Sequence, residues 1–333
     1  MVRLIAPLAV LPVVDCLAGL PSDPVAGPRE SSTALPTLQS VAVPELPDLT
    51  VVAEAFHAAL AGRTIASVDA PGPLAVRGTP AEQAALAGQR LLGVRRRGKF
   101  LILHLSRDRI VVNPMLTGRF QLAGPKVKRP GKTAFVLAFG PRDEPPADAA
   151  TWTAGAGWMP RDEAPAEMRY RDPTQMGKVY LLPAGIEREI PGGGPDDFGP
   201  EADDPELTLD VWRRRIRRHP GELKNLLKNQ EFVAGIGNAY SDEILHAAEL
   251  LPFRKRSTLG EGEIDALHAS MQRIVSDAIA ELRQRVPPTF ETQVRDFLAV
   301  HNKGGQPCPR CGARITQISP GGFITSYCRA CQR

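Results

Sequence analysis

Residues 233–243 read VAGIGNAYSDE, a short glycine turn that leads into a helical pattern. Gly235 and Gly237 carry no Cβ atom, so the backbone of this turn can approach another group closely. The side chain of Asn238 and the amides of the turn can donate hydrogen bonds to a phosphate oxygen. Apolar residues at helical spacing follow over 239–250. The segment therefore predicts a phosphate-contacting turn at the start of a helix.

The sequence on both sides of this turn also predicts helices. Apolar periodicity indicates them over 207–218 with Thr208 as N-cap, 221–232, 239–250 and 260–284, with a short helix over 289–299. Positive charge is concentrated in the same third of the chain. Residues 207–333 hold 19 basic and 13 acidic residues, whereas the net charge of the whole chain is +4. This distribution favours a polyanionic partner, and a solvated basic face is the alternative.

Four of the five cysteines lie at the end of the chain. Cys308 and Cys311 form one C-x2-C pair, and Cys328 and Cys331 form a second pair after sixteen residues. This spacing suits one tetrahedral zinc ion held by four thiolates, and two disulfides or a redox pair are the alternatives. Four protein ligands leave no open position on the metal, so we expect a structural zinc. Reduced thiolates imply a reducing cytosol.

The part of the chain before residue 184 predicts a different class of structure. A helix is indicated over 49–61, and strand-like runs follow at 64–70, 90–95, 99–105, 109–113, 119–122, 133–139 and 178–182. Gly and Pro separate these runs, so we expect a β-sandwich or barrel. An insertion at 140–168 is rich in Pro, Asp and Glu and carries Trp152 and Trp158. Residues 184–206, with three consecutive glycines, are typical of a linker.

Composition and the N-terminal segment limit the class of protein. Apolar residues make up 43% and charged residues 23% of the 333 residues, which excludes a collagen-like, largely disordered or disulfide-scaffold chain. No stretch reaches the roughly 18 apolar residues of a membrane-spanning helix, so no membrane partner is expected. Residues 1–43 are rich in Pro, Ala and Ser and are expected to be a disordered leader. The apolar run at its start weakly resembles a secretory signal.

Three features occur in a fixed order: PELPDL at 44–49, the GIGN turn at 235–238, and the four-cysteine module. In this order they resemble the formamidopyrimidine-DNA glycosylase and endonuclease VIII family. The resemblance spans about 290 residues from Pro44, apart from the insertion at 140–168. It implies an α+β multidomain fold, in which DNA lies between a β-sandwich with a flanking helix and a helix–two-turn–helix domain beside a zinc β-hairpin. We expect these parts at 44–183, 207–299 and 300–333.

The resemblance also implies an activity. Members excise oxidised or otherwise damaged bases from double-stranded DNA in base excision repair and then nick the abasic strand, so a bifunctional glycosylase and abasic-site lyase is expected. We expect it to act as a monomer in the cytoplasm, at the nucleoid. By position, Pro44 matches the family's nucleophile, whose α-amine forms a Schiff base with the sugar, and Glu45 matches its acid/base. Lys99 matches a hairpin lysine at the phosphate near the lesion, Lys224 a lysine at the lesion, and Asn238 a phosphate contact.

Nucleophilic catalysis by Pro44 sets a condition on the N-terminus. An α-amine titrates near 7.7–8.0, so roughly a tenth or more of it is unprotonated at neutral pH, against well under 1% of an ordinary lysine. Inside the chain, however, the nitrogen of Pro44 is a tertiary amide without a basic lone pair. A valine codon can serve as a bacterial start, so we expect the active protein to begin at Val43, with trimming before Pro44. Residues 1–42 would then be a mis-assigned extension, and proteolytic processing is the alternative.

The sequence departs from the family at three DNA-contacting places. Gln175 and Met176 stand where an Arg and an aromatic residue usually fill the hole left by the flipped base. Leu116, or the neighbouring Met115, stands where a Met helps to fill it. Phe323 replaces the usual arginine of the zinc hairpin. These changes weaken an 8-oxoguanine assignment and leave oxidised pyrimidines, ring-opened purines and bulkier adducts open.

Two other classes of function remain as alternatives. The first is a non-catalytic protein that binds damaged DNA on the same fold, which applies if residues 1–43 are retained. The second is a zinc-ribbon RNA-binding module attached to an unrelated β domain. A carboxylate at position 45, in a cleft lined for phosphates, favours the enzyme.

Overall fold

The computed structural model describes residues 43–142, 146–147, 159–191, 194–286, 290–319 and 322–333. All of them belong to one compact unit. The predicted leader, except for Val43, lies outside the described residues, as do Trp152 and Trp158. Within the described ranges, no helix is both long enough and apolar enough to cross a membrane.

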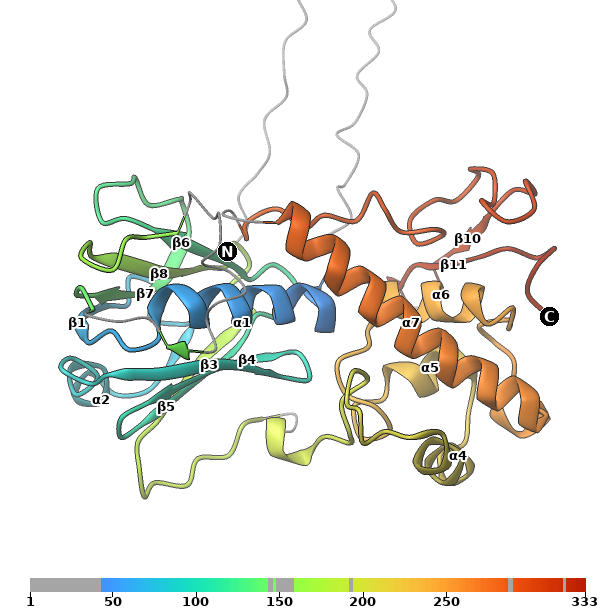
Figure 1. Cartoon of the computed structure of the whole chain (residues 1–333), viewed down its shortest axis with the longest axis horizontal. Helices are drawn as coiled ribbons and strands as arrows, with labels where there is room; N and C mark the ends of the chain where they lie inside the picture. The colour runs from blue at the N-terminus through green and yellow to red at the C-terminus, as the bar shows by residue number, and fades with distance from the viewer. Residues whose placement is uncertain (1–42, 143–145, 148–158, 192–193, 287–289, 320–321) are drawn as a thin grey trace, which may run out of the picture. The chain divides into compact units, whose positions relative to one another are not determined.

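Helix α1 (Leu46–Leu60) is followed by two sheets (Figure 1). The first sheet has four antiparallel strands in the order β1 (Ile65–Asp69), β7 (Thr133–Phe139), β8 (Ala166–Arg171) and β6 (Arg119–Ala123). The second has the order β2 (Val76–Arg77), β9 (Lys178–Leu182), β5 (Arg109–Asn113), β4 (Phe100–Leu105) and β3 (Leu91–Arg97). Its pairs are antiparallel except for β2 and β9. A short helix, α2 (Pro80–Ala84), begins at the N-cap Thr79.

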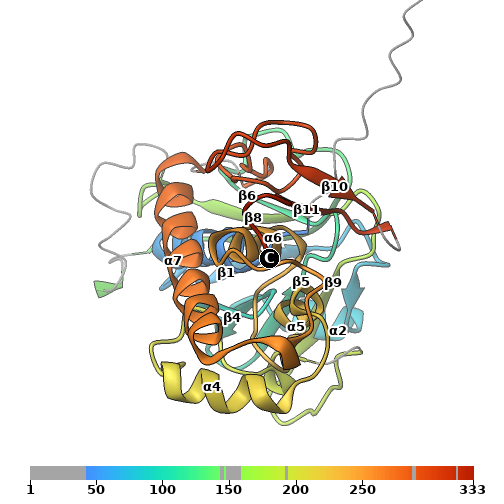
Figure 2. The same ribbon diagram turned by 90° about the vertical axis from the view of Figure 1, so that its right-hand side faces the viewer.

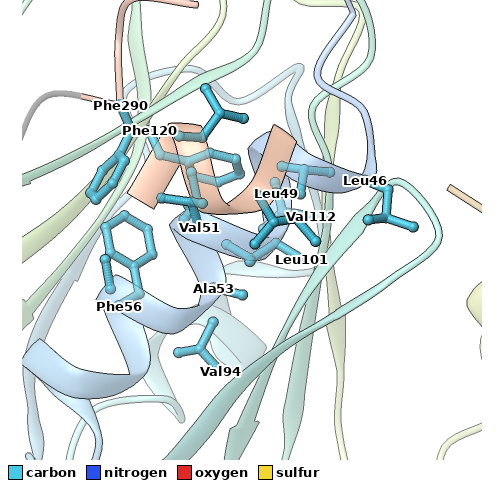
Figure 3. Packing of buried hydrophobic residues seen from close by; sticks show 14 of the residues in the cluster. Leu46, Leu49, Val51, Ala53, Phe56, Val94, Leu101, Val112, Phe120 and Phe290 are labelled. Atoms are coloured by element: carbon cyan, nitrogen blue, oxygen red, sulfur yellow. The ribbon is translucent and has the colours of Figure 1, made fainter. Parts of the chain in front are cut away.

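The core of this half forms where α1 packs against the strands. Apolar residues recur along α1 at helical spacing, and most of its side chains are buried. The ring of Phe56 meets the rings of Phe120 and Phe290 edge to face, with centroids 5.9 and 5.4 Å apart. Figure 3 shows these rings beside Leu49 and Val51 of the same helix. Because Phe290 follows the last long helix, α1 is packed from both halves of the chain.

The second half is helical (Figure 2). It contains α4 (Leu209–Arg218), α5 (Leu223–Lys228), α6 (Asn238–Ala247) and α7 (Glu261–Arg285), with 3-10 turns η2 (Pro195–Asp197) and η3 (Arg256–Thr258). Trp212 lies in its core, where its indole N–H donates to the carbonyl of Ile264 at 3.1 Å and its ring contacts Phe232. The chain closes with an antiparallel hairpin of β10 (Thr316–Ile318) and β11 (Thr325–Tyr327), and β11 packs against α6.

The predicted fold class is confirmed by these elements: a β-sandwich with a flanking helix, a helical region and a cysteine-bearing hairpin. Two local predictions were wrong. Strand β8 occupies the end of the predicted insertion at 140–168 and continues to Arg171. Residues 290–299 form turns rather than a helix. β8 was hidden because Glu167 and Arg169 make it look polar, whereas both are buried and paired with each other at 2.7 Å.

A buried arginine holds the two ends of the insertion against α1. The side chain of Arg63 has no exposed area, and its Nε donates to the carbonyl of Ala59 in α1 at 2.8 Å. Its two terminal nitrogens donate to the carbonyls of Gly140, Ala164 and Arg161 at 3.0, 2.6 and 2.9 Å. One side chain thus satisfies one backbone oxygen of α1 and three from the two ends of the insertion.

Candidate active site

The catalytic pair predicted from the sequence lies at the start of α1. Pro44 is buried, and Glu45 is the N-cap residue with 2% of its surface exposed. The carboxylate of Glu45 accepts hydrogen bonds from the backbone N–H groups of Gly237, Ala239 and Tyr240 at 2.6, 2.8 and 3.3 Å. These groups form the N-terminus of α6, where free amides and the helix dipole attract an anion. The helical half of the chain therefore fixes the orientation of the Glu45 carboxylate.

The glycine turn makes room for this contact. A Cβ atom on Gly237 would lie 2.5 Å from Cδ of Glu45. A Cβ atom on Gly235, whose φ is +96°, would lie 2.6 Å from Leu46. The sequence predicted that these glycines permit close approach to a phosphate. In the structure, the groups that approach the turn are residues at the start of α1.

Lys99 and Pro44 line one pocket. Lys99 lies in the turn between β3 and β4, half-buried, after Gly98 with a φ of +55°. The pocket has a volume of about 530 Å³, and its wall includes Asn113, Met115 and Gln230. Burial lowers the pKa of the Lys99 ammonium, with a further lowering from the charge of Lys228 and an opposing effect of Glu45. The pocket is therefore lined by Pro44, by the partly buried Lys99 and by the loop before α6.

The hairpin that carries Lys99 is held by one carboxylate from the helical side. Glu201 accepts from the backbone N–H of Gly98 at 2.6 Å and from Arg97 at 2.7 Å, and it also pairs with Arg96. Next to Glu201, the carbonyl of Pro200 accepts from the N–H of Ala234 at 2.8 Å. The segment around Glu201 thus connects the Lys99 hairpin to the glycine turn.

Lys224, predicted to contact DNA, is engaged inside the protein. It lies in α5 with 5% of its surface exposed, and its ammonium donates to Asp242 Oδ1, Ile324 O and Thr325 Oγ1 at 2.7, 2.8 and 2.9 Å. Burial lowers the pKa of Lys224, and the charge of Asp242 opposes this effect. Three acceptors use all three donors of an ammonium group. The geometry gives Lys224 a structural role between α5, α6 and the hairpin.

Asn238 shares one of these acceptors. It is the first residue of α6, and its Nδ2 donates to the carbonyl of Ile324 at 2.6 Å. Its Oδ1 is buried and has no hydrogen-bond partner among the described residues. The side-chain amide therefore connects the turn to the C-terminal hairpin of β10 and β11.

The residues predicted to fill the space of a flipped base lie on two neighbouring loops. Gln175, with a φ of +56°, and Met176, 48% exposed, lie between β8 and β9. Leu116 is half-buried between β5 and β6. The hydroxyl of Thr117 hydrogen-bonds to that of Thr174 at 2.6 Å and joins these loops. The structure thus brings Gln175 and Met176 close to the loop of Leu116.

The four cysteines form a group that can hold a metal ion. Their sulfur atoms all lie within 4.8 Å of one another, and none forms a disulfide. The Sγ atoms of Cys311 and Cys328 are 3.6 Å apart, and those of Cys308 and Cys331 are 3.9 Å apart. A tetrahedral zinc ion with Zn–S bonds of about 2.3 Å requires sulfur separations of roughly 3.8 Å. The donor set and spacing fit one zinc ion, as the sequence predicted.

An ion pair that the sequence did not predict lies beside Pro44. Arg295 donates to the carboxylate of Asp48 at 2.5 Å and lies 4.7 Å above the ring of Tyr240. Burial raises the pKa of Asp48, and the charge of Arg295 opposes this effect. Gln293 donates to the carbonyl of Val43 at 3.1 Å. Nothing local could have found these contacts, because they join residues about 250 positions apart.

A β-sandwich and a helical region thus build one site at a proline–glutamate pair, and a hairpin with four cysteines closes the chain. The family sequence model of the formamidopyrimidine-DNA glycosylase N-terminal domain matches residues 43–179, and that of its H2TH domain matches residues 198–286. The chain belongs to the formamidopyrimidine-DNA glycosylase family, which confirms the resemblance seen in the sequence. The family consists of DNA glycosylases of base excision repair.

Relatives and solved structures agree with this assignment. The formamidopyrimidine-DNA glycosylases of Symbiobacterium thermophilum and Geobacillus kaustophilus are each 30% identical over 87% of this chain, which covers 89% and 100% of their lengths. A Lactococcus lactis Fpg bound to DNA containing an abasic site has a TM-score of 0.71 and 27% identity, with 87% of this chain and 99% of that chain covered. The same enzyme bound to N7-benzyl-Fapy-dG DNA has a TM-score of 0.70 and 26% identity over 87% of this chain and 100% of that chain.

Proposed function

We propose that the protein is a monomeric, bifunctional DNA glycosylase and abasic-site lyase that removes damaged bases from duplex DNA at the nucleoid in the cytoplasm. The observation that carries this proposal is the position of the Glu45 carboxylate. It comes from the start of α1, is fixed by three amides of α6 and lies next to Pro44. Pro44 lines a pocket together with Lys99, and the buried carboxylate of Glu45 is next to it in the chain. These residues supply the groups that a Schiff-base mechanism requires.

The proposed reaction has two parts. The nitrogen of Pro44, as a free secondary amine, attacks C1′ of the damaged nucleotide, and the bond from C1′ to the base breaks with its electron pair leaving on the base. The proton that the Pro44 nitrogen loses passes through the Glu45 carboxylate to the sugar ring oxygen, the ring opens as the bond from C1′ to this oxygen breaks, and an iminium ion joins Pro44 to C1′. Loss of a proton from C2′ then expels the 3′ phosphate and cuts the strand. Lys99 binds a phosphate beside the reacting nucleotide.

The amine must be free for this chemistry. An internal Pro44 is a tertiary amide, so the proposal requires a chain whose first residue is Pro44. The family sequence model begins its match at residue 43, and 87% of this chain covers nearly the full length of most relatives and neighbouring structures. These matches support an active form that begins at residue 43, in which trimming before Pro44 frees its nitrogen. The second candidate is a non-catalytic protein that binds damaged DNA. The full chain favours it, because there the nitrogen of Pro44 is an amide and cannot act as a nucleophile.

The zinc ion would be held by Cys308, Cys311, Cys328 and Cys331 and would supply a structural cross-link to the hairpin. Lys224 and Asn238 bind the carbonyl of Ile324, so the hairpin is fixed to the start of α6. We propose that these two residues act on DNA by positioning the hairpin. Gln175, Met176 and Leu116 would occupy the space left by the extruded nucleotide.

The test is borohydride trapping on a duplex with one abasic site. The full chain, a chain that begins at Pro44 and its Glu45→Gln variant are compared for covalent linkage and for binding. The chain that begins at Pro44 should be trapped and the full chain should not, because the full chain has an amide in place of the secondary amine. Glu45→Gln should bind the duplex and lose cleavage of a damaged-base duplex by 10²–10⁴-fold, roughly the range of general acid catalysis. If all forms bind and none is trapped, the protein is the non-catalytic binder.

A further inference from the structure

An exposed aromatic ring and a lysine meet at the edge of the zinc hairpin. Phe323 lies just before β11, and 62% of its surface is exposed. The ammonium of Lys228, at the end of α5, lies 4.8 Å from the centroid of the ring. This distance is within the range of a cation–π contact. Two elements nearly a hundred residues apart in sequence thus present one apolar face and one positive charge to solvent.

The position of this pair is fixed by its neighbours. The carbonyl of Ile324, directly after Phe323, accepts from Lys224 at 2.8 Å and from Asn238 at 2.6 Å. Phe323 is therefore held beside the first residue of α6, whose backbone amides bind Glu45. The residue directly after Lys228, Asn229, lines the pocket of Pro44 and Lys99, so the pair lies next to that pocket.

The combination of groups specifies a class of ligand. The ammonium lies over the ring, and 62% of the surface of Phe323 stays open to solvent, so a ligand can cover the ring without displacing other groups. A nucleotide offers an apolar sugar or base face next to a phosphate, so it matches a ring next to a cation. Aromatic stacking tolerates any base, and the phosphate contact is equally independent of sequence.

We propose that Phe323 and Lys228 together bind one nucleotide of the DNA strand next to the active site, with the ring on its sugar or base and the ammonium on its phosphate. This inference rests on the proposed function, because it takes DNA as the ligand. The proposed contact differs from one made by charge alone, because Phe323 contributes affinity through stacking and Lys228 contributes the salt dependence.

The experiment measures fluorescence anisotropy of a duplex with a tetrahydrofuran abasic analogue at a series of NaCl concentrations, with the full chain. Lys228→Met should reduce the slope of log affinity against log salt by roughly 0.9, the value for one phosphate. Phe323→Ala should weaken binding by roughly 5- to 150-fold, the range for loss of one stacked base, without changing the slope. Phe323→Tyr should retain affinity, and Phe323→Arg should steepen the slope. Lys255→Ala, an exposed lysine in the same half of the chain, is the charge-matched control and should leave the slope unchanged.

The outcomes separate the inference from the proposed function. If the wild type binds the duplex but Lys228→Met keeps the full slope and Phe323→Ala stays within twofold, the pair is a contact within the protein and the inference is wrong. If Phe323→Ala and Lys228→Met both change only the slope, the ring has no contact with the nucleotide. A wild type that shows no salt-dependent affinity for the duplex overturns the proposed function as well.

Discussion

The buried ammonium of Lys224 allows a sharp test of the role that the structure gives it. The change Lys224→Met keeps the length and apolar stem of the side chain and removes its charge. The carboxylate of Asp242, which has no exposed side-chain surface, then loses its strongest cationic partner. It retains hydrogen bonds from His301 at 2.8 Å and from the N–H of Ser326 at 3.0 Å. A buried charge left with only part of its partners typically costs about 3–5 kcal/mol of stability.

Tryptophan fluorescence during urea unfolding measures this loss. Trp212 is buried in the helical half, and changing Trp152 and Trp158 to Phe makes it the sole tryptophan of the chain. With an m value of roughly 2 kcal/mol/M, the expected loss lowers the midpoint by roughly 1.5–2.5 M urea. Lys228→Met is the matched control, because it makes the same change four residues later in the same helix. Its midpoint should shift by less than about 0.3 M, as expected for a change of about 0.5 kcal/mol at a partly exposed site.

The opposite pattern would refute the structural role of Lys224. If the midpoint of Lys224→Met moves no further than that of the control while affinity for the abasic duplex falls tenfold, the ammonium is a DNA ligand. The side chain would then have to leave Asp242 on binding. A double change, Lys224→Met with Asp242→Asn, should recover part of the lost stability, because it removes the unpaired charge.

Three further predictions follow from single contacts. In the chain that begins at Pro44, Gly237→Ala should lower strand cleavage by roughly 10²-fold or more, because the new Cβ would lie 2.5 Å from Cδ of Glu45 and displace the carboxylate. The CD spectrum should stay unchanged. Full activity would show that the carboxylate need not be held there. Cys328→Ser should release the metal, so metal analysis should find about one zinc per chain in the wild type and little in the variant. The affinity for the duplex should fall together with the zinc content. Equal zinc content in both proteins would contradict the four-thiolate site. Arg63→Met should lower the free energy of unfolding by about 3 kcal/mol, measured by CD in urea, because four carbonyls lose their donor. Arg161→Met is the control and should change this free energy little, because its side chain is exposed. Equal effects of the two changes would contradict the role of burial.

Local patterns were enough to predict most elements of the fold. The helix over 49–61 and the strands over 99–105 and 133–139 were found because apolar residues recur at the spacing of a helix or a strand. β8 was missed because its charged residues pair inside the sandwich, and the sequence cannot show that Glu167 and Arg169 are buried. Burial of a charge depends on partners that only the folded chain supplies.

The candidate site was predictable in its members and not in its contacts. The motifs placed Pro44, Glu45, Lys99 and the cysteines, because each occupies a recognisable position in a short pattern. No pattern showed that the amides of α6 hold Glu45, since the donors are backbone groups that every residue except proline possesses. The family resemblance placed Lys224 at the lesion, and no pattern showed its contact with Asp242, which lies eighteen residues away in another helix.

The hold of α6 on Glu45 has a consequence for the growing chain. The partners lie 192 residues apart, so Pro44 and Glu45 leave the ribosome long before the residues that orient them. A nascent or truncated chain that ends before α6 displays Pro44 and Glu45, the proposed nucleophile and acid, without the amides that orient the carboxylate. Such a fragment should be unable to cut DNA, and the cutting activity would begin only when nearly the whole protein has been made.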